Sequence, residues 1–456
     1  GIPYHSAANY IDTLIEKGYK VAICEQVEDP REAKGVVKRE VVQLITPGTV
    51  MQGRGIDEKE NNYVTSITMF EDETFGFAFA DLSTGENKVT LLNSFQDVMN
   101  EVTALAAKEV VIAENFPEDL QKELTDRRSI VFSVEKEISV DNKFGRIISE
   151  LTQEKFVTTM CRLLHYLFKT QKRSLDHMQK TATYETSHYL KIDYHSKRNL
   201  ELTETIRSKG KHGSLLWLLD ETKTAMGARM LKQWVDRPLL SKDNIMARQN
   251  IVQLLMDHFF EREELRETLK EVYDLERLSG RVAFGNANAR DLIALKKSLQ
   301  QVPNILASLG NIADDHIQTL LENLDPCEEV ADLLEMALVE NPPISIKEGN
   351  MIKDGYDASL DQYRDASRNG KSWIAALEKQ EREKTGIKSL KVGFNRVFGY
   401  YIEVTKANIH LLKEGQYERK QTLTNAERYI TPDLKEKEAL ILEAEEKMVD
   451  LEYSIF

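Results

Sequence analysis

Two long, highly charged segments with helical periodicity, residues 350–385 and 432–456, constrain the fold of this chain most strongly. In the second segment, apolar residues recur every seven positions, with two more at the matching intermediate positions: Leu434, Ile441, Met448 and Ile455, then Ala444 and Leu451. This heptad pattern is typical of a seam between packed helices. Thr431 can cap the second helix, Pro432 suits its first position, and Asp433 suits its positive end. We therefore predict two antiparallel helices.

The segment between these helices predicts a small β structure. Residues 391–406, KVGFNRVFGYYIEVTK, predict two strands around a tight bend, and residues 419–431 predict the return of the chain. Residues 388–431 contain eight Lys or Arg and four Glu, which gives a charge of +4 within a chain of formal net charge −14. A basic β tip at the end of two helical arms is suited to contact a polyanion.

The residue types of this tip suggest contacts to a nucleic-acid backbone, because Lys and Arg neutralise phosphates while Thr and Asn donate hydrogen bonds to phosphate oxygens. The predicted DNA- or RNA-backbone-binding residues are Asn395, Arg396, Lys420, Thr422, Asn425 and Arg428. Nothing marks them as readers of bases. A protein-binding tip and a merely solvated surface remain alternatives at this point. We expect substitution of Arg396 or Arg428 by Glu to abolish binding with little effect on thermal stability.

The sequence Gly370-Lys371-Ser372 matches the end of a nucleotide-binding P-loop, but its surroundings do not. A P-loop has a Gly five residues earlier, and this chain has Asp365 there. The upstream apolar residues have helical spacing: Ile352, Tyr356, Leu360 and Tyr363. We therefore predict a helix in which Gly370 only softens the structure, with no ATP site and no catalytic residue.

The first third of the chain predicts mixed α/β structure. Ala8 to Lys17 predicts an amphipathic helix, residues 19–27 a buried strand, residues 39–50 a further strand, and residues 51–61 a linker. The alternating runs that follow, at 63–70, 74–86 and 88–93, predict an antiparallel meander in an α/β domain of about a hundred residues.

Two features of this region could suggest catalysis. Asp81 could be the first carboxylate of a two-metal nuclease, but such chemistry needs several convergent carboxylates and no second candidate follows on a neighbouring strand. His5 and Glu25 have no partner cluster, so surface or core roles are favoured.

Residues 155–340 predict mainly helices, with apolar spacing at 156–171, 212–235 and 263–283. Cys24, Cys161 and Cys327 are too scattered for a disulfide framework or a zinc site, which fits a reducing cytoplasm. No apolar run is long enough for a transmembrane helix. The chain starts with Gly and stops within a helical pattern, so we expect it to be a fragment.

The sequence resembles the MutS family of DNA mismatch repair proteins over nearly its whole length. Residues 1–50 resemble the second half of the family's mismatch-binding domain. Two stretches resemble its core domain, TAMGARMLKQWVDRPL and DLERLSGRVAFGNANARDL. Two further stretches resemble its clamp domain, KVGFNRVFGYYIEVTKAN and QTLTNAERYITPDLKEKE. These stretches occur in the family's order.

The resemblance implies a multidomain fold of α/β and mainly α parts. The implied domains are part of a mismatch-binding domain (1–52), a ribonuclease H-like connector (53–154), a helical core with levers (155–345, continued at 432–456) and a β-tipped clamp (346–431). The family acts as a dimer that encircles duplex DNA, detects mispairs and small loops, uses ATP and Mg²⁺ in an ATPase domain, and recruits a MutL-type partner.

In the family, a Phe-x-Glu mismatch-reading motif precedes the part that residues 1–50 resemble, and an ATPase domain follows the levers. We expect both to be missing from this chain, so the resemblance implies only weak, non-specific, salt-sensitive DNA binding through the clamp. Asn395, Arg396, Thr422, Asn425 and Arg428 lie in the matching stretches. A coiled-coil scaffold that binds proteins is the alternative, and a nuclease that uses Asp81 is a further rival.

Overall fold

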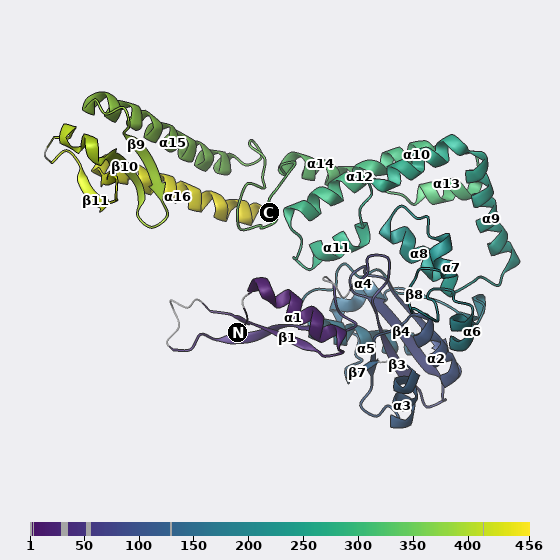
Figure 1. Ribbon diagram of the computed structural model, residues 1–456. Coiled ribbons are helices and arrows are strands. Elements are labelled where there is room, and N and C mark those ends of the chain that lie inside the picture. Colours follow the sequence, from purple (N-terminus) through teal and green to yellow (C-terminus); the bar gives the residue numbers. More distant parts are fainter. Residues whose placement is uncertain (1, 3, 29–34, 52–55, 128–129, 414) are drawn as a thin grey trace. The chain divides into compact units, whose positions relative to one another are not determined.

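The computed structural model describes residues 2, 4–28, 35–51, 56–127, 130–413 and 415–456 (Figure 1). The chain divides into two compact units, residues 1–287 with 297–327, and residues 288–296 with 328–456. Both combine helices with a β-sheet, which confirms the expectation of a mixed α/β chain. Residues 52–55 of the predicted linker lie outside the described residues. None of the described helices has the length and apolar character required to cross a bilayer.

The first unit contains a six-stranded sheet with strand order β7-β6-β3-β4-β5-β8. Its strands are β3 (Tyr63–Met69), β4 (Phe75–Asp81), β5 (Asn87–Leu92), β6 (Glu109–Ile112), β7 (Val131–Val134) and β8 (Ala182–Thr183). β3, β4 and β5 form the predicted antiparallel meander, which is thereby confirmed. Three further strands extend this meander by parallel pairing: β6 pairs with β3, β7 pairs with β6, and β8 pairs with β5.

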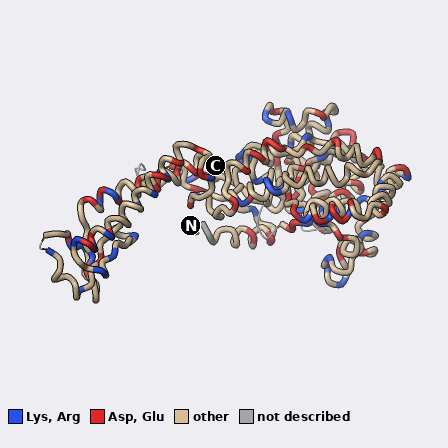
Figure 2. The backbone as a smooth tube through the Cα atoms, turned by 90° about the horizontal axis from the view of Figure 1, so that it is seen from above, with Lys and Arg blue, Asp and Glu red and all other residues tan. Residues whose placement is uncertain are grey.

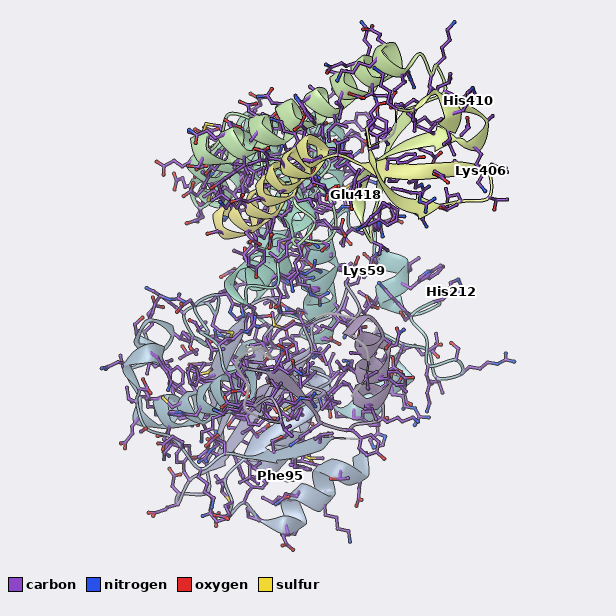
Figure 3. All side chains as sticks on the ribbon, turned by 90° about the vertical axis from the view of Figure 1, so that its left-hand side faces the viewer. Lys59, Phe95, His212, Lys406, His410 and Glu418 are labelled. Atoms are coloured by element: carbon purple, nitrogen blue, oxygen red, sulfur yellow. The ribbon has the colours of Figure 1, made fainter. Side chains whose placement is uncertain are left out.

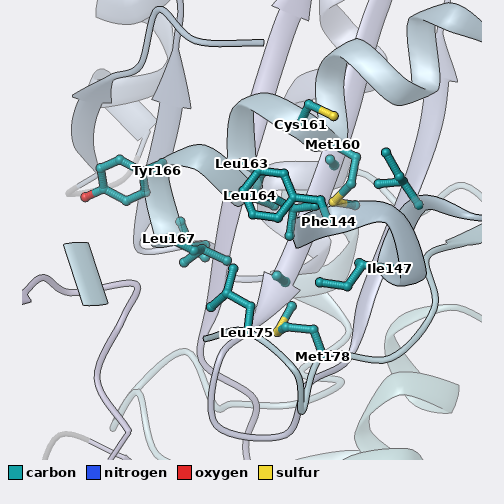
Figure 4. Close-up of a cluster of buried hydrophobic side chains, with 14 of the residues drawn as sticks. Phe144, Ile147, Met160, Cys161, Leu163, Leu164, Tyr166, Leu167, Leu175 and Met178 are labelled. Carbon is teal, nitrogen blue, oxygen red and sulfur yellow. The ribbon is translucent and has the colours of Figure 1, made fainter. Parts of the chain in front are cut away.

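Helices cover both faces of this sheet, namely α2 (Phe95–Ala104), α3 (Glu118–Arg127) and α5 (Glu154–Gln171). α5 packs on the face that carries Ala78, through a buried cluster that includes Met160, Leu163, Leu164 and Leu167 (Figure 4). It lies very close to the sheet, because a Cβ on Gly76 would be 1.9 Å from Thr159 Oγ1. The opposite face carries Phe77, and it packs against α2 and α3. The alternation of the strands is therefore explained by two different apolar surfaces.

The N-terminal segment forms α1 (Tyr4–Glu16) and an antiparallel pair of strands, β1 (Val21–Gln26) and β2 (Arg39–Ile45). The prediction of a buried strand at residues 19–27 is wrong, because Ala22 and residues 24–26 are exposed. Among the described residues this sheet has only two strands, so a large part of β1 faces solvent. The Gln43 Nε2 atom donates to Gln171 Oε1 at 2.9 Å and attaches β2 to α5.

The predicted helical region contains short and long helices. Besides α5, they are α6 (Tyr194–Asn199), α7 (Leu215–Leu219), α8 (Ala225–Asp236), α9 (Lys242–Asp257), α10 (Phe259–Lys270), α11 (Leu275–Ala283), α12 (Ala289–Gly310), α13 (Asp315–Glu322) and α14 (Glu328–Ala337), with the 3₁₀ turn η2 (Thr186–His188). The 3₁₀ turn η1 (Asn142–Phe144) and α4 (Gly145–Ile148) precede this region. The helical prediction is confirmed for most of this region but fails at residues 172–193, which contain only η2 and β8, and at residues 200–214, which contain neither helix nor strand.

Two helical patterns are each divided by a capping residue. The pattern at 212–235 forms α7 and α8, because Thr224 accepts from Gly227 N and starts a new helix. The pattern at 263–283 likewise ends and restarts, because Asp274 accepts from Arg277 N. A side-chain acceptor at an N-cap stabilises a new helix start, and apolar periodicity does not reveal such a break.

The second unit contains α14, two long helices and, between these two helices in the sequence, the strands of a four-stranded sheet. These elements are α15 (Ala358–Thr385), β9 (Lys391–Asn395), β10 (Gly399–Thr405), η3 (Lys406–Leu411), β11 (Glu418–Thr422), β12 (Ala426–Ile430) and α16 (Pro432–Ile455). The sheet order is β11-β12-β10-β9, with antiparallel neighbours. The predicted pair of strands around a tight bend is confirmed by β9 and β10, and the returning segment forms β12, paired with β11. The Thr431 cap is also confirmed, since Thr431 accepts from Leu434 N.

The first long helix starts later than predicted. Residues 350–357 are not helical, because Asp357 caps α15 by accepting from Leu360 N and Gly355 has a φ of +85°. Ile352 instead forms a β-bridge with Leu338. Its apolar side chain is buried in a separate cluster with Leu360, so its helical spacing was coincidental.

α15 and α16 pack antiparallel, since Arg364 pairs with Glu452 while Gly370 lies against Ile441. Ile441 is buried, as the heptad pattern predicts. The expectation that Gly370 only softens the helix is wrong. A Cβ at this position would lie 2.4 Å from Ile441 Cγ1, so glycine is required for the close approach of the two helices.

Candidate nucleic-acid interface

The sheet of the second unit has one face packed on its helices and one face open. Ile402, Val404 and Tyr429 belong to the buried cluster that includes residues of α15 and α16. Because side chains alternate along a strand, Tyr401 and Glu403 point to the other face. The register pairs Glu403 with Arg428 and Ile402 with Tyr429, so Arg428 also lies on the open face.

Arg428 is held on three sides. Its Nε atom donates to Glu403 Oε2 at 2.9 Å, and its Nη1 atom donates to Gln421 Oε1 at 3.0 Å. Its guanidinium carbon lies 4.1 Å from the ring centroid of Tyr401, and a Cβ on Gly393 would lie 2.6 Å from the Tyr401 hydroxyl. The tyrosine therefore lies across the sheet, with Arg428 stacked on it. This arginine contributes to the order of the sheet as well as to its charge.

The turn between β9 and β10 presents Arg396 to solvent. Asn395 Oδ1 accepts from Val397 N at 2.8 Å, which closes the turn locally. Arg396 is exposed and has no ion pair with any described residue. Lys435 of α16 donates to Phe398 O at 2.7 Å, so the turn is attached to the helix. The side-chain oxygen of Asn395 is therefore already used within the turn, whereas the guanidinium of Arg396 is available to a ligand.

The turn between β11 and β12 presents Thr422 and Asn425, and both side chains are exposed. The Lys406 N–H donates to Asn425 O at 3.0 Å, which places the start of η3 beside this turn. Lys420 occupies an irregular position of β11, between residues paired with β12, and is exposed. Figure 3 shows Lys406 and His410 on the side of the sheet turned away from α16.

The register separates the predicted residues into two groups. Asn395 pairs with Gly399 at the start of β10, whereas Ala426 pairs with Thr405 at its end. Six residue steps of a strand span about 20 Å, so the two turns lie at opposite ends of the sheet. Lys420 and Arg428 come from the strands between them.

The positive charge of this sheet is partly neutralised. Figure 2 shows Asp and Glu among the Lys and Arg residues of this unit. Besides the Arg428–Glu403 pair, Arg419 lies 3.7 Å from Glu427. Burial and the neighbouring Glu427 raise the pKa of Tyr429 to about 12, so this tyrosine stays neutral and donates to that carboxylate at 2.7 Å.

Lys391, Arg396, Lys406 and Lys420 are among the exposed cations of the basic segment that have no ion pair with any described residue. Sequence reasoning selected Arg396 and Lys420 but left out Lys391 and Lys406. The available signal for these two was their place in the basic segment, at the start of β9 and directly after β10. Together the four cations and the two turns can contact several phosphates.

The other candidate sites have structural explanations. The Asp81 carboxylate is buried and accepts hydrogen bonds from Asn61 Nδ2, Asn62 N, Ser83 N and Ser83 Oγ, at 2.7–3.2 Å. No group of three potential metal ligands is found among the described residues. Gly370, Lys371 and Ser372 lie inside α15. Glu25 is exposed on β1, and the His5 side chain lies outside the described residues.

Three family models match this chain in succession. They are MutS domain I over residues 1–54, MutS domain II over residues 62–179 and MutS domain III over residues 195–450. The third model alone covers more than half of the chain.

Curated relatives agree with the family models. The chain is 64% identical over 456 residues to the DNA mismatch repair protein MutS of Geobacillus sp. (strain WCH70), which covers 100% of this chain and 53% of the relative. It is 62% identical to the protein of the same name from Bacillus subtilis (strain 168) and 60% identical to that from Listeria monocytogenes, each with 100% of this chain and 53% of the relative covered. The chain spans about half the length of the curated relatives it matches.

Proposed function

Because this chain belongs to the MutS family of DNA mismatch repair proteins, we propose that it contributes to duplex DNA binding in mismatch repair. The binding surface is the open side of the four-stranded sheet with its two exposed turns. The exposed, unpaired cations Arg396, Lys406 and Lys420 carry this proposal. Lys and Arg that lack a carboxylate partner are the groups that gain most from a phosphate.

The geometry favours backbone contact over base reading. The two turns lie about 20 Å apart along the sheet, so they can reach separate phosphates of a duplex rather than a single base pair. Arg396 supplies charge at one turn, and Lys406 supplies it beside Asn425 at the other. Thr422 and Asn425 add exposed hydrogen-bond donors. No sequence specificity follows from such contacts.

The family supplies roles for the other parts. In this proposal, the domains are part of a mismatch-binding domain (1–52), a ribonuclease H-like connector (53–154), a core and lever domain (155–345 and 432–456) and a clamp (346–431). α15 and α16 then carry the clamp sheet. In the whole protein, two copies encircle DNA in the cytoplasm, and ATP with Mg²⁺, bound by an ATPase domain, controls recruitment of a MutL-type partner.

Fluorescence anisotropy of this 456-residue chain with labelled duplexes tests the DNA-binding proposal. One duplex is fully paired and the other carries a G·T mispair, and each is titrated across a range of salt concentrations. With two or three phosphate contacts, log K should fall with log salt at a slope of about −2 to −3. We expect equal binding to both duplexes, because the candidate residues contact the backbone. Tighter binding to the mispair would mean that another part of the chain reads the lesion.

A matched set of variants distinguishes DNA binding by the sheet from an effect of the net charge of the chain. Arg396→Gln and Lys406→Gln should each weaken binding to both duplexes. Lys347→Gln removes the same charge from an exposed position before α15, outside the sheet, and should leave binding unchanged. If all three variants lower affinity equally, DNA binding reflects net charge alone. Binding of an acidic protein without DNA binding would instead support the scaffold alternative.

A further inference from the structure

A cavity of about 250 Å³ lies in the first unit, separate from the sheet of the proposed DNA interface. α8 forms one side, residues of β3, β4 and β5 form another, and Tyr184, Tyr189 and Arg248 complete it. Its lining is rich in aromatic rings and basic side chains. Neither the family roles nor the proposed DNA binding uses this cavity.

Cations outnumber carboxylates in the lining. Arg229, Arg237, Arg248, Lys88 and Lys232 face two carboxylates, Glu86 and Asp236. Asp236 is already paired with Lys197. Glu86 accepts from the Tyr63 hydroxyl at 2.8 Å, and Lys88 lies 3.5 Å from it. Three of the cations also have carboxylate partners, since Arg229 pairs with Asp274 and Glu276, Arg237 with Glu101, and Lys88 with Glu86. The charge that remains available for an anionic ligand therefore lies mainly at Arg248.

Arg248 is the least compensated of these cations. It forms no ion pair with any described residue, and its guanidinium carbon lies 3.6 Å from the ring centroid of Trp234. Burial lowers the pKa of Arg248, although the neighbouring Tyr189 opposes this effect. A guanidinium stacked by its face keeps its N–H edge available, and that edge matches the two oxygens of a phosphate.

Two other cations keep part of their capacity. The Lys232 ammonium lies 3.7 Å from Glu60, at the long end of an ion pair. Arg237 Nη2 donates to Glu101 Oε2 at 2.6 Å, and its guanidinium lies over the rings of Tyr184 and Tyr189 at 5.1 and 6.0 Å. Lys232 can therefore approach an added anion, while Arg237 mainly orders the aromatic wall.

The aromatic wall suits a planar group. Tyr189 and Trp234 line the cavity, and 42% of Trp234 is exposed although Arg248 covers one face of its ring. Stacking of a nucleobase on an aromatic side chain is worth about 1–3 kcal/mol and is tolerant of base identity. The volume lies just below the range of about 300–1,000 Å³ that is typical of small-molecule sites, which favours one phosphate over a chain of phosphates.

We propose that this cavity binds a nucleoside 5′-monophosphate, with the phosphate at Arg248 and Lys232 and the base against Tyr189 and Trp234. The phosphate supplies the counter-charge that Arg248 lacks, and the base fills the aromatic side. This site is independent of the DNA interface, because all of its lining residues belong to the first unit.

Isothermal titration of the 456-residue chain with AMP, adenosine and inorganic phosphate tests the proposal. AMP should bind at least about tenfold more tightly than either fragment, because charge and stacking act together. Binding of phosphate as tight as that of AMP would leave only an anion site and would overturn the nucleotide assignment. Absence of AMP binding at millimolar concentration would also overturn it.

Variants locate the binding. Arg248→Gln should weaken AMP binding at least about tenfold, because it removes a charge-assisted hydrogen bond in a partly buried site. The matched control is Arg262→Gln, since Arg262 also stacks on an aromatic ring, that of Phe259 at 5.1 Å, but lies outside the cavity. If Arg248→Gln fails to fold, Lys232→Gln decides, and unchanged AMP affinity in the folded variant would refute the site.

Discussion

Arg396 and Arg428 should respond differently to substitution, although both were expected from the sequence to act only in binding. Arg396 is exposed on the β9–β10 turn without an ion pair among the described residues. Arg396→Gln should therefore remove about one phosphate contact, which lowers the magnitude of the salt slope by about 0.9. Stability should change by less than about 0.5 kcal/mol, as for other exposed positions.

Arg428→Gln removes three interactions from the sheet. The hydrogen-bonded pair with Glu403 joins side chains that are 18% and 25% exposed, so its loss should cost about 1–2 kcal/mol. The stacking on Tyr401 adds about 0.5–1 kcal/mol. Together with the bond to Gln421, the local stability of the sheet should fall by about 2–3 kcal/mol. DNA binding should fall as a consequence of this disorder.

Hydrogen exchange of peptides from β10 and β12 measures the stability of this sheet, and anisotropy on labelled duplex measures its DNA binding. A local probe is needed because a chain with two compact units does not unfold as one two-state system. The reasoning predicts faster exchange in β10 and β12 for Arg428→Gln only. It would be refuted if Arg396→Gln destabilised these strands while Arg428→Gln left their exchange unchanged.

Three further changes test the structure of the second unit. Gly370→Ala should destabilise the α15–α16 pair by about 1–3 kcal/mol, although alanine has the better helix propensity, because the new Cβ meets Ile441. Faster hydrogen exchange in α16 would report this loss. Gly310→Ala is the control, because the space around its Cβ is open. Glu452→Gln should accelerate hydrogen exchange in the same helix and lower its local stability by about 3 kcal/mol, because it leaves Arg364 without its buried carboxylate partner. Equal exchange in wild type and variant would contradict the importance of this pair. Hydrogen bonds and charge from Lys296 and Lys353 lower the pKa of Glu335 from 4.5 to about 2, so the stability that Glu335 contributes is present above pH 4.5 and is lost as the pH falls towards 2. Hydrogen-exchange protection of α14 in wild type and in Glu335→Gln should therefore converge over this range, and a constant difference would rule the effect out.

Much of the second unit was predictable because its local signals agree. The heptad of α16, its Thr431 cap and the strand pair at residues 391–406 all predicted the same arrangement, and the structure contains each of them. The β3–β5 meander was predictable for the same reason. Where a local signal competed with a tertiary one, prediction failed. Ile352 fits the spacing of α15 but is buried beside Leu338 in a different cluster.

The candidate site was predictable in composition but not in geometry. Residue types identified Asn395, Arg396, Thr422 and Asn425 as candidate phosphate-contacting residues of a basic tip. Only the register shows that these turns lie at opposite ends of the sheet, because it depends on which residues of β10 pair with each neighbour. The role of Arg428 was hidden for a similar reason. Glu403 is distant in sequence, and cross-strand pairing alone brings it opposite Arg428.

The two ends of this sheet are attached to different helices, which makes the helix seam relevant to binding. Lys435 and Glu438 of α16 hold the turn that carries Arg396, through Phe398 O and Tyr400 N.

The α15 helix holds the start of β9, because Glu378 accepts from Val392 N and Arg382 donates to Leu390 O, both at 2.7 Å. Sliding of α15 along α16 should therefore shear the sheet and change the distance between the two turns that we propose to bind phosphates. The close packing at Gly370 and the buried Arg364–Glu452 pair oppose such sliding. The spacing of the proposed DNA contacts thus depends on residues of the helix pair that lie outside the proposed interface.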